Sequence, residues 1–297
     1  MNTVSVIGVG RMGGALAIAL SRVGFRVERL AYRSAVPAQT IVAAIRPSPA
    51  VISSDQLACL DSDIVLLTAG DMELADAADL AAPLMKDGAV LLHTSGALTS
   101  DVLEKAAARG VATGSMHPLV SISDPELGAE RFAGAYFCVE GTPPAAAAAR
   151  VIAAALGGNP FVIEKGYKPL YHASAVLASG HLAALLSAAV RTLSACGIEA
   201  ALAKEILTPL VKSSVANAQA QELSAALTGP FARVDPEAVS RHLDAFEKSG
   251  LVIEKEIYIC LGFEALRLAG ELGGNAANLA KIRDIMMFAR KARKVLK

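Results

Sequence analysis

The sequence predicts a doubly wound α/β domain followed by an all-α domain. Over the first half of the chain, eight short β-rich runs alternate with alanine-rich segments that are long enough for crossover helices. After about Glu164 the strand signals stop, and the remaining patterns are helical. Strands that alternate with helices are typical of a mainly parallel sheet covered on both faces. We therefore expect one domain over residues 1–165 and a helical domain over residues 166–297.

Each expected strand is bounded by Gly, Pro, Ser or Asp. The strands are expected at residues 4–8, 27–32, 50–53, 63–69, 89–93, 111–115, 135–140 and 160–164. The helices of the second domain are expected at residues 169–196, 199–221, 236–248, 252–272 and 276–295. The alanine-rich run before the last strand is expected to be an ordinary helix, because Thr142 can cap it, Pro143 suits its first turn and Gly157 suits its exit.

Composition narrows the classes of function. Lysine plus arginine and aspartate plus glutamate both count 28, so no net field favours nucleic acid, a membrane surface or acidic substrates. The four cysteines lie far apart without a CxxC pair, which argues against a disulfide frame or a zinc site. The N-terminus shows no basic leader or cleavage site. We expect a cytoplasmic protein that binds a small molecule and no metal.

An 18-residue run without a full charge, from Ala173 to Val190, is near the lower limit of a membrane-spanning helix. It is mostly alanine and serine, with Gly180 and His181 in the middle, and neither a second candidate span nor a basic flank accompanies it. We expect a buried helix at the centre of the helical domain. Such helices often form dimer cores, which predicts a homodimer and no membrane partner.

The segment GVGRMGGALAIAL follows the first expected strand and places Gly8, Gly10 and Gly13 in the spacing GxGxxG. The first glycine permits a tight turn, the second lets a pyrophosphate approach the backbone, and the third allows close helix packing. The start of the following helix would then face the phosphates. Arg11 and Met12 belong to the same turn, and Arg11 either contacts the phosphates or points into water. The pattern predicts a dinucleotide site.

The end of the second expected strand indicates which dinucleotide binds. An NAD site usually has Asp or Glu there, about 20 residues after the glycines. This sequence has Tyr32, Arg33 and Ser34 instead, and Glu28 lies too early in the strand. A guanidinium and a hydroxyl suit a 2′-phosphate. The sequence therefore favours NADP(H) over NAD(H), the alternative being that Arg33 is a solvated loop residue.

Ligands of open α/β sheets lie beyond the carboxyl ends of the strands. This rule selects Thr68, Ala69 and Gly70 after one strand, where the chain should pass near the nicotinamide ribose. It also selects the loop with Ser95 and the segment with His117, which could present polar groups to a substrate. Each of these segments could instead be a simple polar loop.

Lys168 and His172 are four residues apart at the start of the long apolar helix, so they can share one helix face. The helix N-terminus disfavours a positive charge on His172, which would leave the imidazole able to exchange a proton. Reduction of a carbonyl or imine needs a proton donor beside the hydride donor. The alternatives are a surface lysine and a hydrogen-bonded packing histidine.

Seven motifs carry a resemblance to a known family over nearly the whole chain. They are GVGRMG, HTSGAL, GSMHPLVS, FCVEG, KPLYHASAVLAS, ALTGPFARVD and HLDAF. In these the chain resembles a family, assigned as NADP-dependent oxidoreductases, that joins a Rossmann-like domain to a DUF2520 domain. The resemblance implies a cofactor domain followed by a helical domain, similar to pyrroline-5-carboxylate reductase, F420-dependent NADP oxidoreductase and the group related to 6-phosphogluconate dehydrogenase. It implies no particular substrate.

The chain departs from the family at two positions, where members usually carry asparagine for Gly180 and glycine for Val234. The SGSGPAY-like segment of pyrroline-5-carboxylate reductases is also absent, which weakens an assignment to proline synthesis. The KxxxH spacing of Lys168 and His172 is similar to the KxxxN of β-hydroxyacid dehydrogenases, where the lysine is the acid or base. The HPL at His117 and the preceding serine loop are similar to segments of prephenate dehydrogenases, whose histidine handles the hydroxyl proton.

Arg233 lies between two helices and could clamp a substrate carboxylate, or could pair with Asp235 in the turn. The leading expectation is an NADPH-dependent reductase of a small carbonyl or imine that carries a carboxylate. Its proton donor would be His117 or the pair of Lys168 and His172. The alternatives are an enzyme with the flavin-like F420 as hydride partner and a non-catalytic module that senses NADP.

Overall fold

The computed structural model describes residues 2–33 and 39–291. The chain forms two compact units, Met1–Ser179 and Gly180–Lys297. The division expected at 165/166 assigns helix α7 (Lys168–Ala178) to the helical domain, whereas the compact units assign it to the first. Every residue proposed above from the glycine turn to His172 therefore belongs to the first unit.

The first unit contains an eight-stranded sheet with the strand order β3-β2-β1-β4-β5-β6-β7-β8. Neighbouring strands are parallel, except that β6 and β7 are antiparallel. The eight strands match the eight expected runs, so the doubly wound α/β prediction is confirmed. Their bounds are β1 Thr3–Ile7, β2 Arg26–Tyr32, β3 Ala50–Ser53, β4 Ile64–Leu67, β5 Val90–His93, β6 Ala112–Pro118, β7 Tyr136–Gly141 and β8 Asn159–Phe161.

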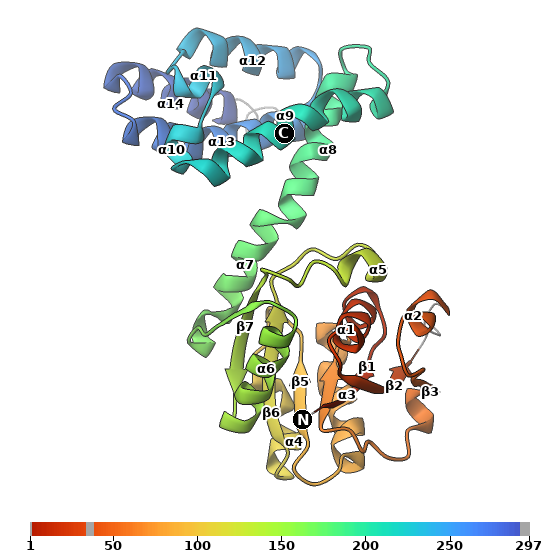
Figure 1. Cartoon of the computed structure of the whole chain (residues 1–297). Coiled ribbons are helices and arrows are strands. Elements are labelled where there is room, and N and C mark those ends of the chain that lie inside the picture. Colours follow the sequence, from red (N-terminus) through yellow and green to blue (C-terminus); the bar gives the residue numbers. More distant parts are fainter. Residues whose placement is uncertain (1, 34–38, 292–297) are drawn as a thin grey trace. The chain divides into compact units, whose positions relative to one another are not determined.

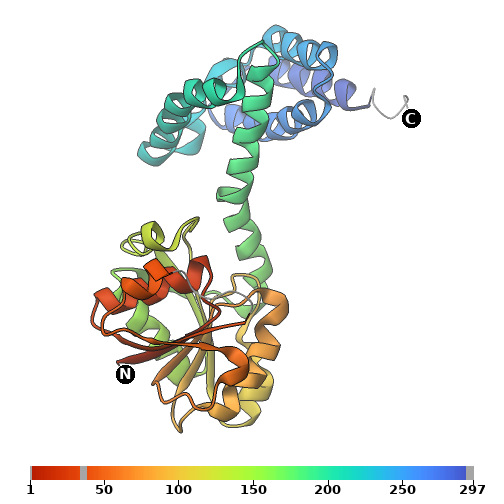
Figure 2. The same ribbon diagram turned by 90° about the vertical axis from the view of Figure 1, so that its right-hand side faces the viewer.

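Helices cover both faces of this sheet (Figure 2). Successive side chains of a strand point to opposite faces. In β4, Ile64 and Leu66 accordingly join the larger hydrophobic core with α1, and Val65 and Leu67 join the second core with α3. The helices of this unit, besides α7, are α1 Arg11–Arg22, α2 Gln39–Ala43, α3 Leu74–Ala81, α4 Glu104–Ala108, α5 Pro125–Gly128 and α6 Pro143–Ala155.

The antiparallel pairing of β6 with β7 sets the register that matters for the site. Ser115 lies opposite Glu140, and His117 lies opposite Cys138. Because residues two apart on a strand share a face, Ser115 and His117 point to the same side of the sheet. Both lie towards the carboxyl end of β6, where the chain leaves the parallel part of the sheet.

The second unit is helical, as expected, and its core includes Val239, Ile259, Ile282 and Met286. Its helices are α8 Gly180–Ser194, α9 Ala200–Ala220, α10 Leu223–Ala226, α11 Gly229–Ala232, α12 Pro236–Lys248, α13 Val252–Glu271 and α14 Ala276–Lys291 (Figure 1). The expected end of the last helix at residue 295 lies outside the described residues.

The stretch expected as one helix over residues 169–196 is instead two helices, α7 and α8. The backbone departs from helical geometry at Ser179, with φ −124° and ψ −74°. A Cβ atom at Gly180, where the family usually has asparagine, would meet no atom within 4 Å. The break therefore lies in the backbone angles of Ser179, and no steric contact at Gly180 is needed to explain it.

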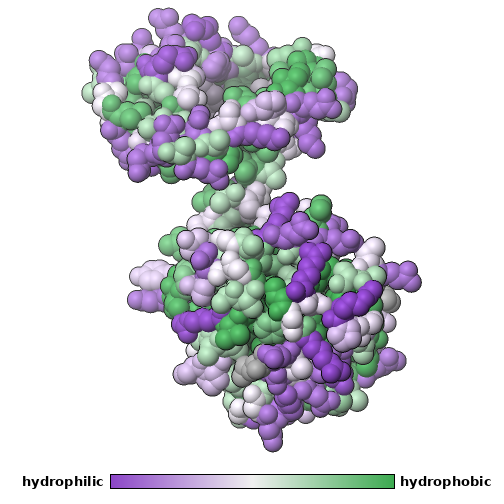
Figure 3. All heavy atoms as spheres, viewed as in Figure 1, coloured by the Kyte–Doolittle hydropathy of each residue, from purple (hydrophilic) through white to green (hydrophobic). Residues whose placement is uncertain are grey.

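Among the described residues, one helical stretch, Lys165–Ser194, is long and apolar enough to cross a membrane, and 6% of its most apolar window is buried. The expectation of a buried core helix is therefore wrong for the single chain. Figure 3 shows apolar side chains at the surface of this stretch. The sequence pattern correctly predicted an apolar helix, but such a pattern does not distinguish a buried helix from an exposed one.

The expected side-chain cap by Thr142 is wrong. Thr142 occupies the N-cap position of α6 but makes no cap hydrogen bond, and its hydroxyl donates to the Thr113 carbonyl oxygen at 3.3 Å instead. Val234, where the family usually has glycine, has φ 51°, a region that favours glycine and strains a β-branched residue. Its side chain is buried in the helical core, which offsets that strain.

Candidate functional site

The glycine turn between β1 and α1 has the geometry that a dinucleotide site requires. Gly8 has φ 96°, and a Cβ atom there would lie 2.8 Å from the backbone nitrogen of Ala69. A Cβ at Gly13 would collide with the Thr68 hydroxyl and the Gly8 carbonyl. At Gly10 no atom lies within 4 Å of that position, so the outer side of the turn is open. Two glycines therefore close the turn, and the third leaves room for a ligand.

The N-terminus of α1 faces this opening. Its N-cap, Gly10, provides no side-chain cap, and its first turn contains no acidic residue. The first N–H groups of a helix lack partners within the helix, and its dipole favours an anion there. Arg11 begins the helix and is exposed, while Met12 packs partly against the core of the sheet. The turn is suited to a pyrophosphate.

A cavity of about 380 Å³ extends from the glycine turn along the ends of β2 and β4. Tyr32, Arg33, Ala69 and Gly70 line it together with Gly8 and Gly10. Thr68 also lines it, but its hydroxyl donates to the Gly8 carbonyl and so holds the turn closed. Ser34 lies outside the described residues.

The far end of this cavity contains an ion pair that the sequence did not suggest. Arg33 donates through Nη2 to Oε1 of Glu73, which also lines the cavity. Both side chains are substantially exposed, so the pair is weak and can exchange partners. A 2′-phosphate at Arg33 would therefore either displace Glu73 or share the guanidinium with it.

The second polar cluster lies at the carboxyl ends of β5 and β6. His117 Nδ1 lies 2.6 Å from the hydroxyl oxygen of Tyr171, and the two rings meet edge to face with centroids 5.6 Å apart. Tyr171 also packs its ring against Phe161. Tyr171 comes from the first turns of α7, so one hydrogen bond fixes the orientation of the His117 imidazole. An oriented imidazole is the arrangement that general acid–base catalysis requires.

His172, the neighbour of Tyr171, lies against the same imidazole from another side. The centroids of the His117 and His172 rings are 5.9 Å apart. A Cβ atom at Gly96 would collide with His172 Nδ1 and would lie 2.8 Å from His117 Nε2. His172 Nδ1 is buried and has no hydrogen-bond partner among the described residues. Both imidazoles therefore approach the loop after β5 so closely that a side chain at Gly96 would displace them.

Burial controls the ionisation of this cluster. It lowers the pKa of His117 to about 4, and the proximity of His172 and Lys168 acts in the same direction. Burial likewise raises the pKa of the Tyr171 hydroxyl above its ordinary value. At neutral pH the cluster is therefore a neutral imidazole hydrogen-bonded to a neutral phenol.

Ser95 shapes the loop that carries Gly96. Its hydroxyl accepts hydrogen bonds from the backbone N–H groups of Ala97 and Leu98, at 3.2 and 3.0 Å. Its own N–H donates to His93 Nδ1 at 3.1 Å. His93 is fully buried, and burial lowers its pKa to about 4. The Ser95 hydroxyl proton is not used in these contacts.

Lys168 lies in a different environment from the one expected for a proton donor to substrate. Its side chain is 0% exposed, and Nζ lies 3.2 Å from Oε1 of Glu140, whose side chain is 5% exposed. Nζ also donates to the hydroxyl of Ser115. The ammonium group is thus fully buried and already has two partners. Of the expected donors, His117 and His172 are only half-buried.

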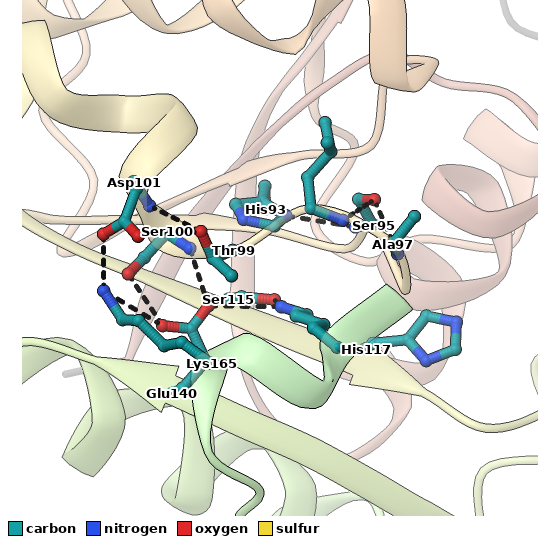
Figure 4. Close-up of polar contacts among 12 residues, drawn as sticks. His93, Ser95, Ala97, Thr99, Ser100, Asp101, Ser115, His117, Glu140 and Lys165 are labelled. Carbon is teal, nitrogen blue, oxygen red and sulfur yellow. Dashed lines mark hydrogen bonds and ion pairs between the residues drawn. The ribbon is translucent and has the colours of Figure 1, made fainter. Parts of the chain in front are cut away.

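Glu140 is the centre of this buried network (Figure 4). Its Oε1 accepts from the backbone N–H of Ser100 at 2.6 Å, and its Oε2 accepts from the Ser100 hydroxyl at 2.7 Å. Lys165, which pairs with Asp101 at 2.6 Å, lies 3.7 Å from Oε2. Burial alone would raise the pKa of Glu140, but the hydrogen bonds from Ser100 and the charge of Lys168 lower it below its ordinary value.

Arg233 belongs to the second unit and is exposed at the C-terminal end of α11. No ion pair within 4 Å joins it to Asp235 among the described residues, although the Arg233 charge contributes to the lowered pKa of Asp235 after the backbone hydrogen bonds and the charge of Arg241. The Asp235 carboxylate caps α12 by accepting from the N–H groups of Glu237 and Ala238. Within residues 2–33 and 39–291, no group of three or more His, Cys, Asp or Glu side chains could hold a metal ion.

Comparison with protein families assigns both parts of the chain. A Rossmann-like domain model matches residues 2–118, and a model named domain of unknown function DUF2520 matches residues 135–264. The chain joins a Rossmann-like domain to a DUF2520 domain. Among curated proteins, none matches this chain in sequence.

Solved structures share this two-domain fold at low sequence identity. A Bacteroides fragilis protein provisionally named an NADP oxidoreductase is 19% identical, with a TM-score of 0.73 over 89% of this chain and 97% of its own. A Thermotoga maritima protein whose name gives no function is 22% identical, with a TM-score of 0.67 over 90% and 98%. Plasmodium falciparum pyrroline carboxylate reductase, solved with NADP bound, is 14% identical, with a TM-score of 0.58 over 96% and 98%.

Both matched segments contribute to the His117 cluster. The Rossmann-like segment provides Gly96 and His117, whereas the DUF2520 segment begins before β7 and provides Glu140, Tyr171 and His172. All five residues nevertheless lie in the first compact unit. The start of the DUF2520 segment is therefore part of the α/β unit in space.

Sequence reasoning missed Tyr171, Glu140 and Glu73. A signal for Tyr171 was available, because it lies three residues after Lys168 and therefore on the helix face assigned to Lys168 and His172. Glu140 stood in a quoted motif but had no partner within the local sequence. Its partners Ser100 and Lys168 are 40 and 28 residues away.

Proposed function

We propose that this protein is an NADPH-dependent oxidoreductase that acts on a small carbonyl or imine bearing a carboxylate. The observation that carries the proposal is the His117 and Tyr171 pair at the sheet edge that also bears the glycine turn. β1, β4, β5 and β6 form a continuous parallel part of the sheet, so their carboxyl ends lie at one edge. A cofactor site and a proton-transfer site thus share an edge.

The residues present fit an NADP nucleotide. The open side of Gly10 and the uncapped start of α1 suit the pyrophosphate, and Arg33 suits the 2′-phosphate. The fold neighbours support the same cofactor, because one is named an NADP oxidoreductase and another was solved with NADP bound. The bound nucleotide would supply a hydride to the substrate.

His117 would exchange the proton that accompanies this reduction. If Nδ1–H donates to the Tyr171 hydroxyl oxygen, Nε2 faces the Gly96 loop and is free to hold or release a proton. The protonated imidazole then donates from Nε2 to the substrate oxygen or nitrogen, and the neutral imidazole accepts the proton in the reverse direction. Tyr171 keeps the ring in this orientation.

The polar side chains around His117 support an enzyme over a sensor of NADP. A sensor needs no proton donor, and a site closed by apolar residues would serve it equally well. Here two imidazoles and a phenol converge, and one imidazole nitrogen is buried without a partner. Buried polar atoms without partners are costly, so they are typical of a site that a ligand completes.

Arg233 is the residue we propose for the substrate carboxylate. It is exposed and, among the described residues, forms no ion pair, while the nearby Asp235 is engaged as a helix cap. A guanidinium can bind a carboxylate through two parallel hydrogen bonds. Replacing Arg233 with lysine should therefore raise the KM for a carboxylate substrate without changing the affinity for NADPH.

We also propose that the helical domain forms a homodimer. Leu202, Ile206 and Leu210 recur every four residues on α9, so they share one face, and all three are exposed. Exposed apolar faces of this kind are typical of association surfaces. A membrane is the less favourable cover for the neighbouring α8, because Arg191 there pairs with Glu254 of α13 at 2.6 Å. Light scattering of the purified protein should give twice the chain mass.

The experiment that tests the function is a titration with NADPH and NADH, followed by a panel of keto acids and cyclic imines monitored by loss of nicotinamide absorbance. We expect tighter binding of NADPH and turnover of at least one compound. Binding without turnover of any compound would favour a sensor or an F420-linked enzyme. Binding of neither nucleotide would contradict the proposal.

A further inference from the structure

We propose that the buried pair of Lys168 and Glu140 is a positioning device for His117, and that Lys168 does not exchange a proton with the substrate. The pair fixes the first turn of α7 and the loop after β5 on the sheet, so that Tyr171 and Gly96 meet the imidazole. The proposal rests on the function proposed for His117. It gives a positioning role to Glu140 and Ser115, which take no part in the proposed proton transfer.

The spacing of the contacts on β6 and α7 carries the proposal. Ser115 and His117 are two residues apart on one face of β6, a separation of about 6.6 Å along a strand. Lys168 and Tyr171 are three residues apart on α7, where side chains so spaced are about 5–6 Å apart. Lys168 bonds Ser115 and Tyr171 bonds His117. The helix is therefore attached to the strand at two matched points, of which one is the proposed catalytic imidazole.

Glu140 connects this attachment to the loop after β5. Both of its oxygens accept from Ser100, which begins the short 3-10 helix η4 (Ser100–Leu103) immediately after that loop. Its Oε1 is also 3.2 Å from Lys168 Nζ. Because Glu140 lies opposite Ser115 on β7, one carboxylate holds the loop end, the strand pair and the helix start together.

The burial of the pair indicates a role in position rather than in stability. A buried ion pair is often no more stabilising than apolar residues of similar volume, because both charges must leave water. All oxygens of Glu140 are nevertheless satisfied, and the ammonium has two partners. Such a network is directional, so it defines where α7 begins, which apolar packing alone would define less sharply.

The charge of Lys168 also acts on the imidazoles at a distance. After burial and the proximity of His172, it contributes to the lowered pKa of His117, and it contributes to that of His93. Of the groups around His117, Asp71 acts in the opposite direction. Removing the ammonium should therefore change both the orientation and the ionisation of His117.

The test compares the wild-type protein with the double variant Lys168→Met/Glu140→Gln, which replaces the pair by neutral side chains of similar length. The ¹⁵N resonances of the His117 imidazole, recorded without substrate, report its tautomer and its pKa. The matched control is Lys105→Met, which removes a lysine from an exposed ion pair with Asp79. Ser115→Ala serves as a milder variant that removes one hydrogen bond only, should the double variant fail to fold.

We expect the double variant, or Ser115→Ala in its place, to bind NADPH within about twofold of wild type while the His117 resonances shift. With a turned-over substrate, kcat should fall about 10- to 100-fold, the range expected for a misplaced catalytic group. The Lys105→Met control should leave the resonances unchanged. The imidazole readout needs no substrate, so a failure of the proposed reaction would not obscure it.

Unchanged His117 resonances in a folded double variant, or in Ser115→Ala, would overturn the positioning role. A loss of turnover above about 1000-fold in Lys168→Met with unchanged His117 resonances would also overturn it, because a loss of that size is typical of a missing proton donor.

Discussion

Tyr171 places its hydroxyl oxygen 2.6 Å from Nδ1 of His117, although the two residues are 54 positions apart in the sequence. The bond joins the start of α7 to the carboxyl end of β6 within one compact unit. It leaves Nε2 of His117 facing the loop that contains Gly96. The function proposed for His117 depends on this orientation of its imidazole.

Replacing Tyr171 with phenylalanine should lower kcat about 10- to 100-fold, because the ring would stay against Phe161 while the hydrogen bond that orients His117 is lost. The dissociation constant for NADPH should change by less than about twofold, since Tyr171 does not line the cavity at the glycine turn. Steady-state kinetics and calorimetry measure the two quantities. Unchanged kcat would show that the bond is incidental.

The pH dependence of the reaction should follow the lowered pKa of His117. Because burial holds this pKa near 4, the imidazole is neutral at pH 7 and only a small fraction carries the proton that reduction requires. For reduction, kcat/KM should rise about tenfold for each unit as the pH falls from 8 towards 5. Oxidation, which uses the neutral form, should be independent of pH above about 5. A break in either profile near 6.5 would contradict this assignment.

Substitution of Gly96 by alanine should abolish the close approach of the two imidazoles to the loop. The new methyl group would lie 2.8 Å from His117 Nε2 and closer still to His172 Nδ1. We expect a loss of turnover of about 100-fold from displacement of the ring, with NADPH affinity retained. Gly166→Ala is the matched control, because no atom lies within 4 Å of its added methyl. Equal effects of the two substitutions would refute the prediction.

The ion pair of Arg33 with Glu73 predicts how the cofactor preference can be altered. Glu73→Gln removes a carboxylate that competes with a 2′-phosphate for Arg33, so NADPH should bind about two- to fivefold more tightly, the value of a weak exposed pair. NADH, which lacks that phosphate, should be affected less. Asp76→Asn is the control, since Asp76 lines the same cavity. Weaker NADPH binding in Glu73→Gln would mean that Glu73 holds the ribose instead.

Much of the fold could be predicted because its signals are local. Each strand is a short apolar run with clear ends, and the glycine turn follows from three positions after β1. The break between α7 and α8 was missed although a signal was present, because a Ser-Gly pair such as Ser179 and Gly180 is a common site of helix kinks. The apolar pattern of these helices also does not distinguish a buried face from the exposed face that the structure shows.

The candidate site was predicted in part. His117, His172 and the Ser95 loop were selected by the carboxyl-end rule and by helix spacing, and the structure brings them together. The burial of Lys168 was not foreseen, because its partner Glu140 is brought near by the antiparallel register of β6 and β7. Pairing between distant strands leaves no mark in the spacing of residues along the chain.

The most direct test of the central claim measures NADPH binding and a single turnover in wild type and in His117→Asn. Asparagine is close to the imidazole in polarity but cannot carry the proton. We predict equal affinity for NADPH and a loss of at least about 100-fold in the rate at which nicotinamide absorbance disappears. A variant that binds NADPH and turns over within a few-fold of wild type would show that His117 is not the group that exchanges the proton.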